Sequence, residues 1–401
     1  MPQLWAGIDA GKHHHHVFVI DETGTRRFSR RIPNDEETIL EVLAKVNALA
    51  EGAPVTWATD LTDGGARLLI SVLAAHEQNL LYIPGRTLYH AAKAYTGEGK
   101  TDAKDARIIA DQARMRRDLK PVSFDDEVAA ELRMLTGYRA DLVADRTRVI
   151  NRLRATLLEY FPGLERAFDY ARSKAGLLLL TGYQTPAAIR EAGEEALTDW
   201  LRTRGARAPG KVAGTAIEAA NAQHTTVTGQ AAGAAIVARL AEEILRLDSD
   251  ITGIEAQITQ KFQDYADAEI LLSMPGFGPL LAAEFIAHSG GNPAEVFTSA
   301  DRLASAAGLA PAPRDSGRIS GNHHRPRRYN RRLLRTCYLA AQIAVRCCAV
   351  SQAFYQRKRL KGKNHKQAVL ALARRRINVI WAMLRDKTEF HTGSVPAPAT
   401  A

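Results

Sequence analysis

The sequence contains few cysteines, and this scarcity limits the possible classes of protein. Only three occur among 401 residues, at Cys337, Cys347 and Cys348. Their spacing fits neither a disulfide framework nor a zinc site, so we interpret them as buried structural thiols in a reducing compartment.

Long apolar runs are also missing. No stretch approaches the roughly 18–20 consecutive apolar residues that a membrane-spanning helix requires. The first residues follow a strand pattern rather than the charged-then-apolar pattern of a signal sequence. Hydrophobic residues still make up 46% of the chain, enough for two or three domain cores. We therefore expect a cytoplasmic protein without a membrane partner.

Acidic residues are almost absent from residues 314–376. This segment has 14 Arg and 4 Lys against one acid, Asp315, which gives it a net charge of +17. The whole chain carries +10, so the remainder sums to −7. Basic charge confined to one block is typical of polyanion binding. Because SGNHHRP and LKGKNHK interrupt the block, nucleic acid is favoured over a membrane surface.

The first 122 residues have the pattern of an α/β domain. Three short strand patterns at 4–9, 16–21 and 26–32, with tight connections, predict consecutive hairpins. Strands are then expected at 54–60 and 80–84, and helices from near the Asn34 cap to about 51 and at 64–76, 86–95 and 102–117. This order predicts a ribonuclease-H-like (RuvC-like) domain over residues 1–122.

The remainder of the chain is predicted to be mostly helical. Two long amphipathic patterns, at 125–161 and about 234–263, predict an antiparallel coiled-coil pair or a dimerisation arm. Two helices of an ordinary bundle fit the pattern equally well, and residues 164–232 carry no chemical motif. The expected parts are a helical connector at 123–265, a mostly helical domain at 266–387 and a disordered tail at 388–401.

Four aspartates form a pattern that suits metal-dependent chemistry. Asp9 and Asp60 end two strands that such a fold places side by side, whereas Asp102 and Asp105 share one face of a helix. Oxygen ligands of this kind suit Mg²⁺ or Mn²⁺, and a pair of such ions supports phosphodiester chemistry. We predict all four as catalytic metal ligands, with Asp63 as an alternative to Asp60. In the competing interpretation, Asp9 and Asp60 are turn residues at strand ends, and Asp102 and Asp105 lie on a solvated helix.

Two groups of residues surround these aspartates. Lys100 precedes the helical pair and Lys104 lies between its two aspartates, and both lysines are suited to contact a phosphate backbone. The run His13–His16 lies between a strand and its hairpin partner, where alternate side chains point to opposite faces. We interpret it as part of the hairpin, with one or two histidines near the metal or DNA, rather than as a purification tag.

Two motifs precede and enter the basic block. Residues 274–285 (MPGFGPLLAAEF) have the form of a helix-hairpin-helix, in which Gly276 and Gly278 direct backbone N–H groups toward phosphate. An ordinary corner between two helices fits the same residues. Downstream, a proline-broken loop presents Ser316 among arginines that can grip a phosphate, although a serine hydroxyl needs a base or a metal to become a nucleophile. The predicted nucleic-acid contacts of this region are Arg314, Arg318, Arg325, Arg327, Arg328, Arg331, Arg332, Lys363 and Lys366.

Five segments together resemble the insertion-sequence one-ten (IS110/IS116-like) family of transposases, whose relatives are called bridge-RNA-guided recombinases. They are GIDAGK, KTDAKDARIIAD, SMPGFGPLLAAEFIA, GLAPAPRDSGRISGN and GKNHKQAVLALARRRINVIWAML, and they occur in the family's order.

The resemblance implies a DEDD RuvC-like domain, a coiled-coil connector and a transposase domain with a nucleophilic serine. The family's acidic residues match Asp9, Asp60, Asp102 and Asp105, although its second position is commonly Glu, and its serine matches Ser316. It further implies Mg²⁺-assisted attack of that serine on DNA, in a dimer or tetramer. A structured guide RNA would pair with donor and target DNA.

The residues alone leave two other functions open. A nuclease of the Holliday-junction type would use the same carboxylates with water as the nucleophile. A non-catalytic scaffold would bind nucleic acid without cutting it.

Overall fold

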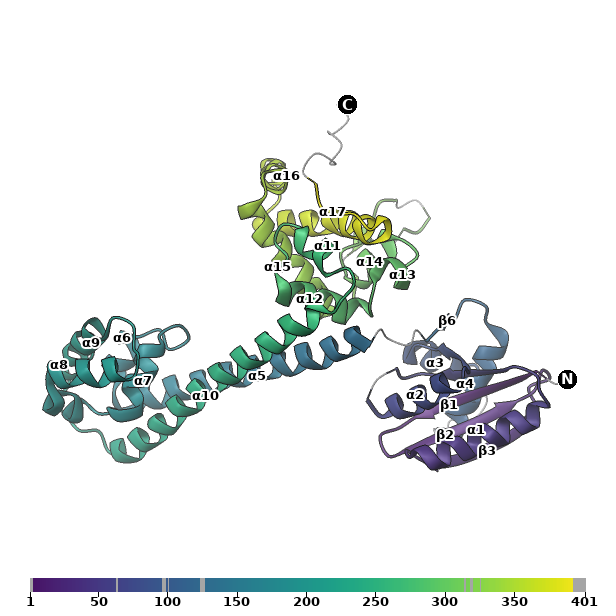
Figure 1. Ribbon diagram of the computed structural model, residues 1–401, viewed down its shortest axis with the longest axis horizontal. Coiled ribbons are helices and arrows are strands. Elements are labelled where there is room, and N and C mark those ends of the chain that lie inside the picture. The colour runs from purple at the N-terminus through teal and green to yellow at the C-terminus, as the bar shows by residue number, and fades with distance from the viewer. Residues whose placement is uncertain are drawn as a thin grey trace. The chain divides into compact units, whose positions relative to one another are not determined.

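The computed structural model places the chain in two compact units, residues 1–124 and 125–401 (Figure 1). It describes residues 3–62, 64–95, 99, 101–122, 127–313, 315–317, 320–324 and 326–391.

The first unit is built on a six-stranded mixed sheet. Its first three strands form the two predicted hairpins, β4 and β5 run parallel to β1, and the short β6 pairs antiparallel with β5 at the edge. The order across the sheet is β3-β2-β1-β4-β5-β6. The strands are β1 (Leu4–Ala10), β2 (His14–Ile20), β3 (Arg26–Pro33), β4 (Val55–Thr59), β5 (Asn79–Tyr82) and β6 (Lys120–Pro121). This is the strand arrangement that the sequence predicts for an RNase H-like layer, with β6 as an unpredicted addition.

Helices cover both faces of the sheet. α1 (Glu36–Ala50) and α2 (Arg67–Ala75), the latter preceded by a 3-10 turn at Gly64–Ala66, pack with alternate side chains of β1 such as Ile8. α3 (Gly85–Ala92) and α4 (Asp102–Met115) pack on the opposite face. The alternation of side chains along β1 therefore separates two cores, one on each side of the sheet.

Two long helices dominate the first part of the second unit (Figure 1). α5 (Glu127–Tyr160) and α10 (Gln230–Gln263) pack along each other and run antiparallel. Glu131, near the start of α5, pairs with Lys261, near the end of α10, at 2.8 Å. Between the two helices the chain forms α6 (Pro162–Ala167), α7 (Lys174–Gly182), α8 (Pro186–Thr203) and α9 (Pro209–Asn221). The antiparallel pair is present, and a supercoiled seam between its members stays a prediction.

The C-terminal part is a helical bundle whose core is continuous with that of the long pair. Its elements are α11 (Ala268–Ser273), α12 (Pro279–Ser289), α13 (Pro293–Val296), α14 (Ala300–Ala306), β7 (Ala312–Pro313), β8 (His323–His324), α15 (Arg331–Cys347), α16 (Ala349–Leu360) and α17 (His365–Asp386). After α17 the backbone N–H of Phe390 donates to Ser273 Oγ at 2.8 Å. Of the tail predicted to be disordered, residues 392–401 lie outside the described part of the chain.

Two expectations about burial and membranes concern this bundle. Cys337 and Cys348 are buried as predicted, whereas Cys347 is exposed, so the prediction of three buried thiols was wrong for that residue. Among the helices that the structure describes, none alone is long and apolar enough to cross a membrane. α15 and α16 reach that length and composition only when they are taken together across a 103° bend.

Candidate active site

Asp9 and Asp60 lie at the carboxyl ends of two adjacent parallel strands. Ile8 of β1 is the register partner of Thr59 of β4, so Asp9 and Asp60 are the next residues along each strand. Ile8 is fully buried in the core beneath α1 and α2. Because side chains alternate along a strand, both carboxylates continue on the opposite face, the one that α4 covers.

A close approach between β1 and α4 fixes the distance across this face. A Cβ atom on Gly7 would lie 2.1 Å from the carbonyl oxygen of Ala106 and 2.3 Å from the nitrogen of Ala110. Both alanines are completely buried. Only glycine on the strand and small residues on the helix permit this contact. Since Asp9 lies two residues after Gly7, the strand carboxylate is held close to the N-terminal half of α4.

The first turn of α4 carries the other two predicted ligands. Thr101 caps the helix, and its Oγ accepts a hydrogen bond from Lys104 N at 3.2 Å. Asp102 is exposed and Asp105 is half-buried, both in the first turn, where carboxylates also stabilise the helix dipole. The competing interpretation of a solvated helix therefore fits the exposed Asp102, and it does not conflict with a role for either carboxylate as a ligand.

Two of the four consecutive histidines separate to opposite faces of the sheet, as the alternation predicts. His15 is buried on the α1 side, and burial lowers its pKa. His16 is the register partner of Asp9, and its Nε2 lies 2.9 Å from Ser29 Oγ. Burial lowers the pKa of His16, while the nearby charge of Asp102 opposes this change. His16 therefore lies beside Asp9 in the sheet, within electrostatic reach of the first turn of α4.

The carboxylates share a face but do not form a ready-made cage. Within the described residues, no group of three or more His, Cys, Asp or Glu side chains is arranged to hold a metal ion. Carboxylates that converge without a cation repel one another, so side-chain rotation is needed to bring their oxygens onto one ion. Asp63, the alternative to Asp60, and Lys100 lie outside the described residues.

Replacing Gly7 with Ala is expected to destabilise the first unit by about 3 kcal/mol, because the added methyl group overlaps the α4 backbone. Displacing α4 is also expected to move the Asp102 turn relative to Asp9, which would weaken binding at the predicted metal site. Urea unfolding measures the first effect. Gly85→Ala is the matched control, because a Cβ there meets nothing within 4 Å, and equal stability of the two variants would contradict the proposed contact.

Ser316 lies in the hairpin loop between β7 and β8. Its side chain is exposed, and the adjoining Asp315 accepts a hydrogen bond from Asn322 N at 2.9 Å, which closes the loop. After the hairpin, Asn330 N donates to the carbonyl of Ala306 at 2.8 Å, and Asn330 Oδ1 caps α15. The serine is therefore presented to solvent from a loop whose exit is fixed to the bundle.

The structure describes some, but not all, of the basic residues predicted to contact nucleic acid. Arg314, Arg318 and Arg325 lie outside the described residues. The remaining six in the basic block, Arg327, Arg328, Arg331, Arg332, Lys363 and Lys366, are all exposed, while Lys104 of the first unit is half-buried. The exposed cations of the second unit are accessible to a polyanion.

The turn between α11 and α12 gives its two glycines different surroundings. Gly276 has φ +88°, and a Cβ there would lie 2.3 Å from the carbonyl of Ala340, so it is packed against α15. Arg376, 5% exposed, donates to the Pro275 carbonyl and holds the same turn. Gly278 is exposed, with open space around it. Helix packing explains Gly276, and a helix-hairpin-helix contact to phosphate stays a prediction, best suited to Gly278.

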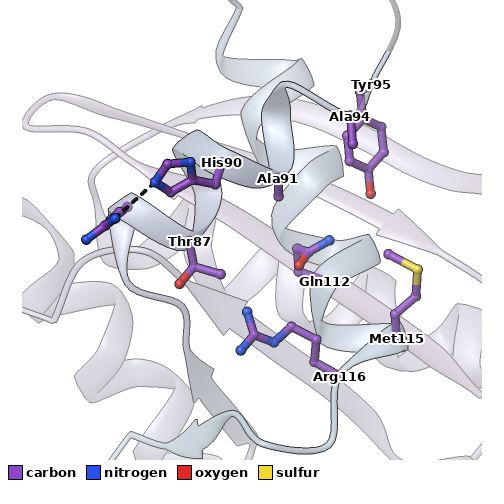
Figure 2. A pocket seen from close by; sticks show the side chains of 9 residues that line it. Thr87, His90, Ala91, Ala94, Tyr95, Gln112, Met115 and Arg116 are labelled. Atoms are coloured by element: carbon purple, nitrogen blue, oxygen red, sulfur yellow. Dashed lines mark hydrogen bonds between the residues drawn. The ribbon is translucent and has the colours of Figure 1, made fainter. Parts of the chain in front are cut away.

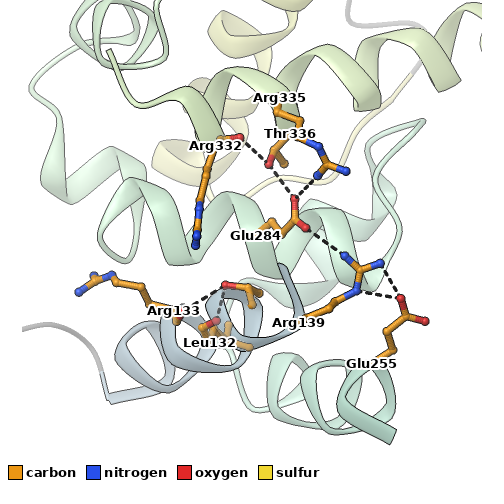
Figure 3. A network of polar contacts seen from close by, with 9 residues as sticks. Leu132, Arg133, Arg139, Glu255, Glu284, Arg332, Arg335 and Thr336 are labelled. Atoms are coloured by element: carbon orange, nitrogen blue, oxygen red, sulfur yellow. Dashed lines mark hydrogen bonds and ion pairs between the residues drawn. The ribbon is translucent and has the colours of Figure 1, made fainter. Parts of the chain in front are cut away.

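A polar network joins α12 to α5 and α15 and extends to α10. Figure 3 shows Glu284 between Arg139 of α5 and Arg335 of α15, at 3.6 Å and 3.4 Å. Arg139 also pairs with Glu255 of α10, and Thr336 donates to Glu284 at 3.1 Å. A single carboxylate thus connects the long helical pair to the bundle that carries the serine loop.

Sequence reasoning missed Gly7, His16 with Ser29, and the Thr101 cap. A glycine between large apolar residues in a strand is itself a signal of close backbone approach. The contact of His16 with Ser29 depends on strand register and has no comparable local signal.

Two family models match separate parts of the chain. A DEDD transposase family model, described as "Transposase", matches residues 6–162. A second, described as "Transposase IS116/IS110/IS902 family", matches residues 268–356. These ranges contain the carboxylates and the serine loop, respectively.

Similar proteins extend over essentially the whole chain. The 42 kDa protein of insertion element IS900 from Mycobacterium paratuberculosis is 57% identical over 396 residues, covering 99% of each chain. The 44.8 kDa protein of insertion element IS116 from Streptomyces clavuligerus is 49% identical, covering 100% of this chain and 98% of the relative. The 43.6 kDa protein of insertion element IS110 from Streptomyces coelicolor is 35% identical, covering 98% and 96%.

Proposed function

Because the chain belongs to the IS116/IS110/IS902 family of transposases, we propose that it cuts and rejoins DNA with the four aspartates of the first unit and Ser316 of the second. The observation that carries this proposal is the placement of Asp9 and Asp60, side by side at the strand ends, on the face covered by α4.

The donor set fits a divalent cation of the Mg²⁺ or Mn²⁺ class. Asp9 and Asp60 supply oxygens from the sheet, while Asp102 and Asp105 supply them from the helix above it. Bound there, such a cation neutralises charge on a phosphodiester and lowers the pKa of an attacking hydroxyl. The close contact at Gly7 supports the proposal, because it holds the backbone of α4 against β1.

Ser316 is the proposed nucleophile. Its hydroxyl oxygen forms a bond to phosphorus, loses its proton, and displaces a deoxyribose hydroxyl, which leaves a phosphoserine link. Attack by a hydroxyl of another strand then forms the new phosphodiester and releases the serine. The exposed Arg327 and Arg328 beyond the loop are suited to hold the phosphates on either side.

Further parts of the proposal concern partners. The basic block of residues 314–376 favours simultaneous contact with DNA and a structured guide RNA, which supplies sequence recognition by base pairing. Met134 and Tyr138 lie one helical turn apart on α5 and are 75% and 57% exposed. These apolar side chains support association of α5 with a second copy in a dimer or tetramer.

A metal-dependence assay tests the proposal directly. Purified full-length protein, DNA containing the element ends and RNA transcribed from the flanking non-coding region are combined with EDTA, Mg²⁺ or Mn²⁺. We expect strand cleavage with either ion and none with EDTA. We also expect Mn²⁺ to raise the melting temperature of the protein without nucleic acid. Undiminished cleavage in EDTA would contradict a role of the carboxylates as metal ligands. Undiminished recombination without RNA would contradict the guide-RNA hypothesis.

A further inference from the structure

A cavity lies between α4 and the β2–β3 hairpin of the first unit. Its volume is about 630 Å³, and Phe18 and Ile108 contribute apolar surface to it. Three cations, Arg26 from β3 and Lys104 and Arg107 from α4, also line it. Arg26 and Arg107 are exposed, so their guanidinium groups are accessible from solvent.

A second cavity, of about 570 Å³, adjoins the first and is drawn in Figure 2. It lies between α3 and the C-terminal half of α4, and Tyr95 lines both cavities. Figure 2 shows Thr87, Gln112 and Arg116 around a common space beside Ala91. The volume is within the range of small-ligand sites, and the lining combines apolar surface with a few hydrogen-bonding groups.

Tyr95 lines both cavities, and a hydrogen bond holds its side chain. Its hydroxyl donates to Asp111, which also pairs with Arg114 at 2.7 Å. Burial and the bond to Asp111 raise the pKa of Tyr95 to about 12, so the phenol stays neutral. A fixed aromatic ring between two open cavities costs little conformational entropy when a planar group stacks on it.

The charge of the two cavities differs from that of the unit around them. Residues 1–124 contain 16 basic and 16 acidic residues, which sum to zero. Yet none of the described residues that line either cavity is Asp or Glu. Five basic residues line them, namely Arg26, Lys104, Arg107, Arg86 and Arg116. The basic lining is therefore a local feature and does not follow from composition.

We propose that the two cavities form one site, the α3–α4 groove, for a short single-stranded stretch of nucleic acid. Phosphates lie against Arg26, Lys104 and Arg107, and a base stacks on Tyr95 and enters the second cavity. Basic side chains beside an aromatic platform are the usual means of binding single strands without sequence preference. DNA and RNA strands share this chemistry.

The position of the groove connects it to the proposed active site. Lys104 follows Asp102 by two residues in the first turn of α4, so the groove begins where the helical carboxylates lie. A strand bound along α4 is thereby directed toward Asp9 and Asp102. The inference rests on the proposed function for its class of substrate, and it adds a binding surface away from the carboxylates.

Photochemical cross-linking of full-length protein tests the groove. Matched DNA and RNA 12-mers that contain 5-iodouracil are irradiated with the protein in EDTA, and cross-linked peptides are identified by mass spectrometry. We expect a cross-link in the peptide containing Tyr95 with at least one oligonucleotide. If only one 12-mer cross-links, the groove binds that type of nucleic acid. Equal yields from the DNA and RNA 12-mers indicate that the groove binds features common to both. Cross-links confined to the basic block of residues 314–376 would overturn the proposal.

Variants separate the groove from other effects. Tyr95→Ala, or Arg26→Glu combined with Arg107→Glu, is expected to lower the cross-link yield on the α3–α4 peptides about tenfold. Tyr89→Ala is the matched control, because Tyr89 is 60% exposed on α3 and lines neither cavity. The charge variants change only exposed side chains, so they test the groove even if Tyr95→Ala unfolds. Equal yields from these variants and the control would contradict the site.

The experiment also distinguishes this inference from the proposed function. Cross-linking in EDTA needs no cleavage, and Asp9→Asn is expected to cross-link like the unchanged protein. A retained cross-link in a protein without metal-dependent cleavage would contradict only the catalytic proposal. Metal-dependent cleavage without any cross-link to α3 or α4 would contradict only the groove.

Discussion

The Asp9→Asn variant is expected to lose metal-dependent DNA cleavage by about a thousandfold or more. Asp9 lies at the end of β1 on the α4 face, and the amide removes one negative charge from the ligand set. Losing about 4 kcal/mol of charge stabilisation corresponds to this factor. Cleavage rates measured over a range of Mn²⁺ concentrations test the prediction, because a weakened site also requires more metal.

The metal-free protein provides the internal control for Asp9→Asn. Removing one of several neighbouring carboxylates relieves repulsion, so the variant should melt at the same temperature as the unchanged protein or slightly higher. Added Mn²⁺ should stabilise the unchanged protein more than it stabilises the variant at the same concentration. Glu37→Gln, an exposed change in the first turn of α1 on the other face of the sheet, should behave like the unchanged protein. Full cleavage by Asp9→Asn would exclude Asp9 as a ligand.

The Ser316→Ala variant is expected to lose strand joining by about ten-thousandfold or more, the scale seen when an enzyme loses its nucleophile. The covalent protein–DNA adduct should disappear with it. Denaturing gel electrophoresis of labelled DNA measures the adduct, and peptide mapping after nuclease digestion should locate phosphoserine at residue 316. Because the side chain is exposed, the folded state should be unaffected.

Ser320→Ala is the matched control for Ser316→Ala, since Ser320 is an exposed serine of the same loop. It should retain both the adduct and strand joining. If Ser316→Ala still cuts DNA in a metal-dependent reaction without an adduct, water is the nucleophile, and the nuclease hypothesis replaces the recombinase. If Ser320→Ala loses the adduct instead, the nucleophile was assigned to the wrong serine.

Much of the first unit could be predicted from local sequence patterns. Period-two alternation identified the three hairpin strands, and the helix predicted at 102–117 begins at Asp102, as α4 does. The same alternation correctly predicted that neighbouring histidines such as His15 and His16 face opposite sides of the sheet. These features depend on contacts within a strand or a helical turn, which the sequence encodes directly.

Features that depend on packing between distant segments could not be predicted in the same way. Gly276 fits the phosphate-binding hairpin motif, yet its surroundings are set by α15, more than 60 residues later in the chain. The approach of Gly7 to Ala106 likewise joins a strand to a helix about 100 residues away. Residues 164–232 were predicted to be helical and lie between the two long helices, as α6 to α9 do, but the sequence did not show how these helices pack.

The antiparallel course of α5 and α10 has an evolutionary consequence. α5 ends at Tyr160 and α10 begins at Gln230, so the helices between these residues form an insertion at one end of the pair. Residues gained or lost there do not change which residues of α5 face those of α10, including Arg139 and Glu255. The loops of this lobe can therefore change in length between lineages while α5 and α10 keep their alignment, provided that the side chains packed on the shared core are kept.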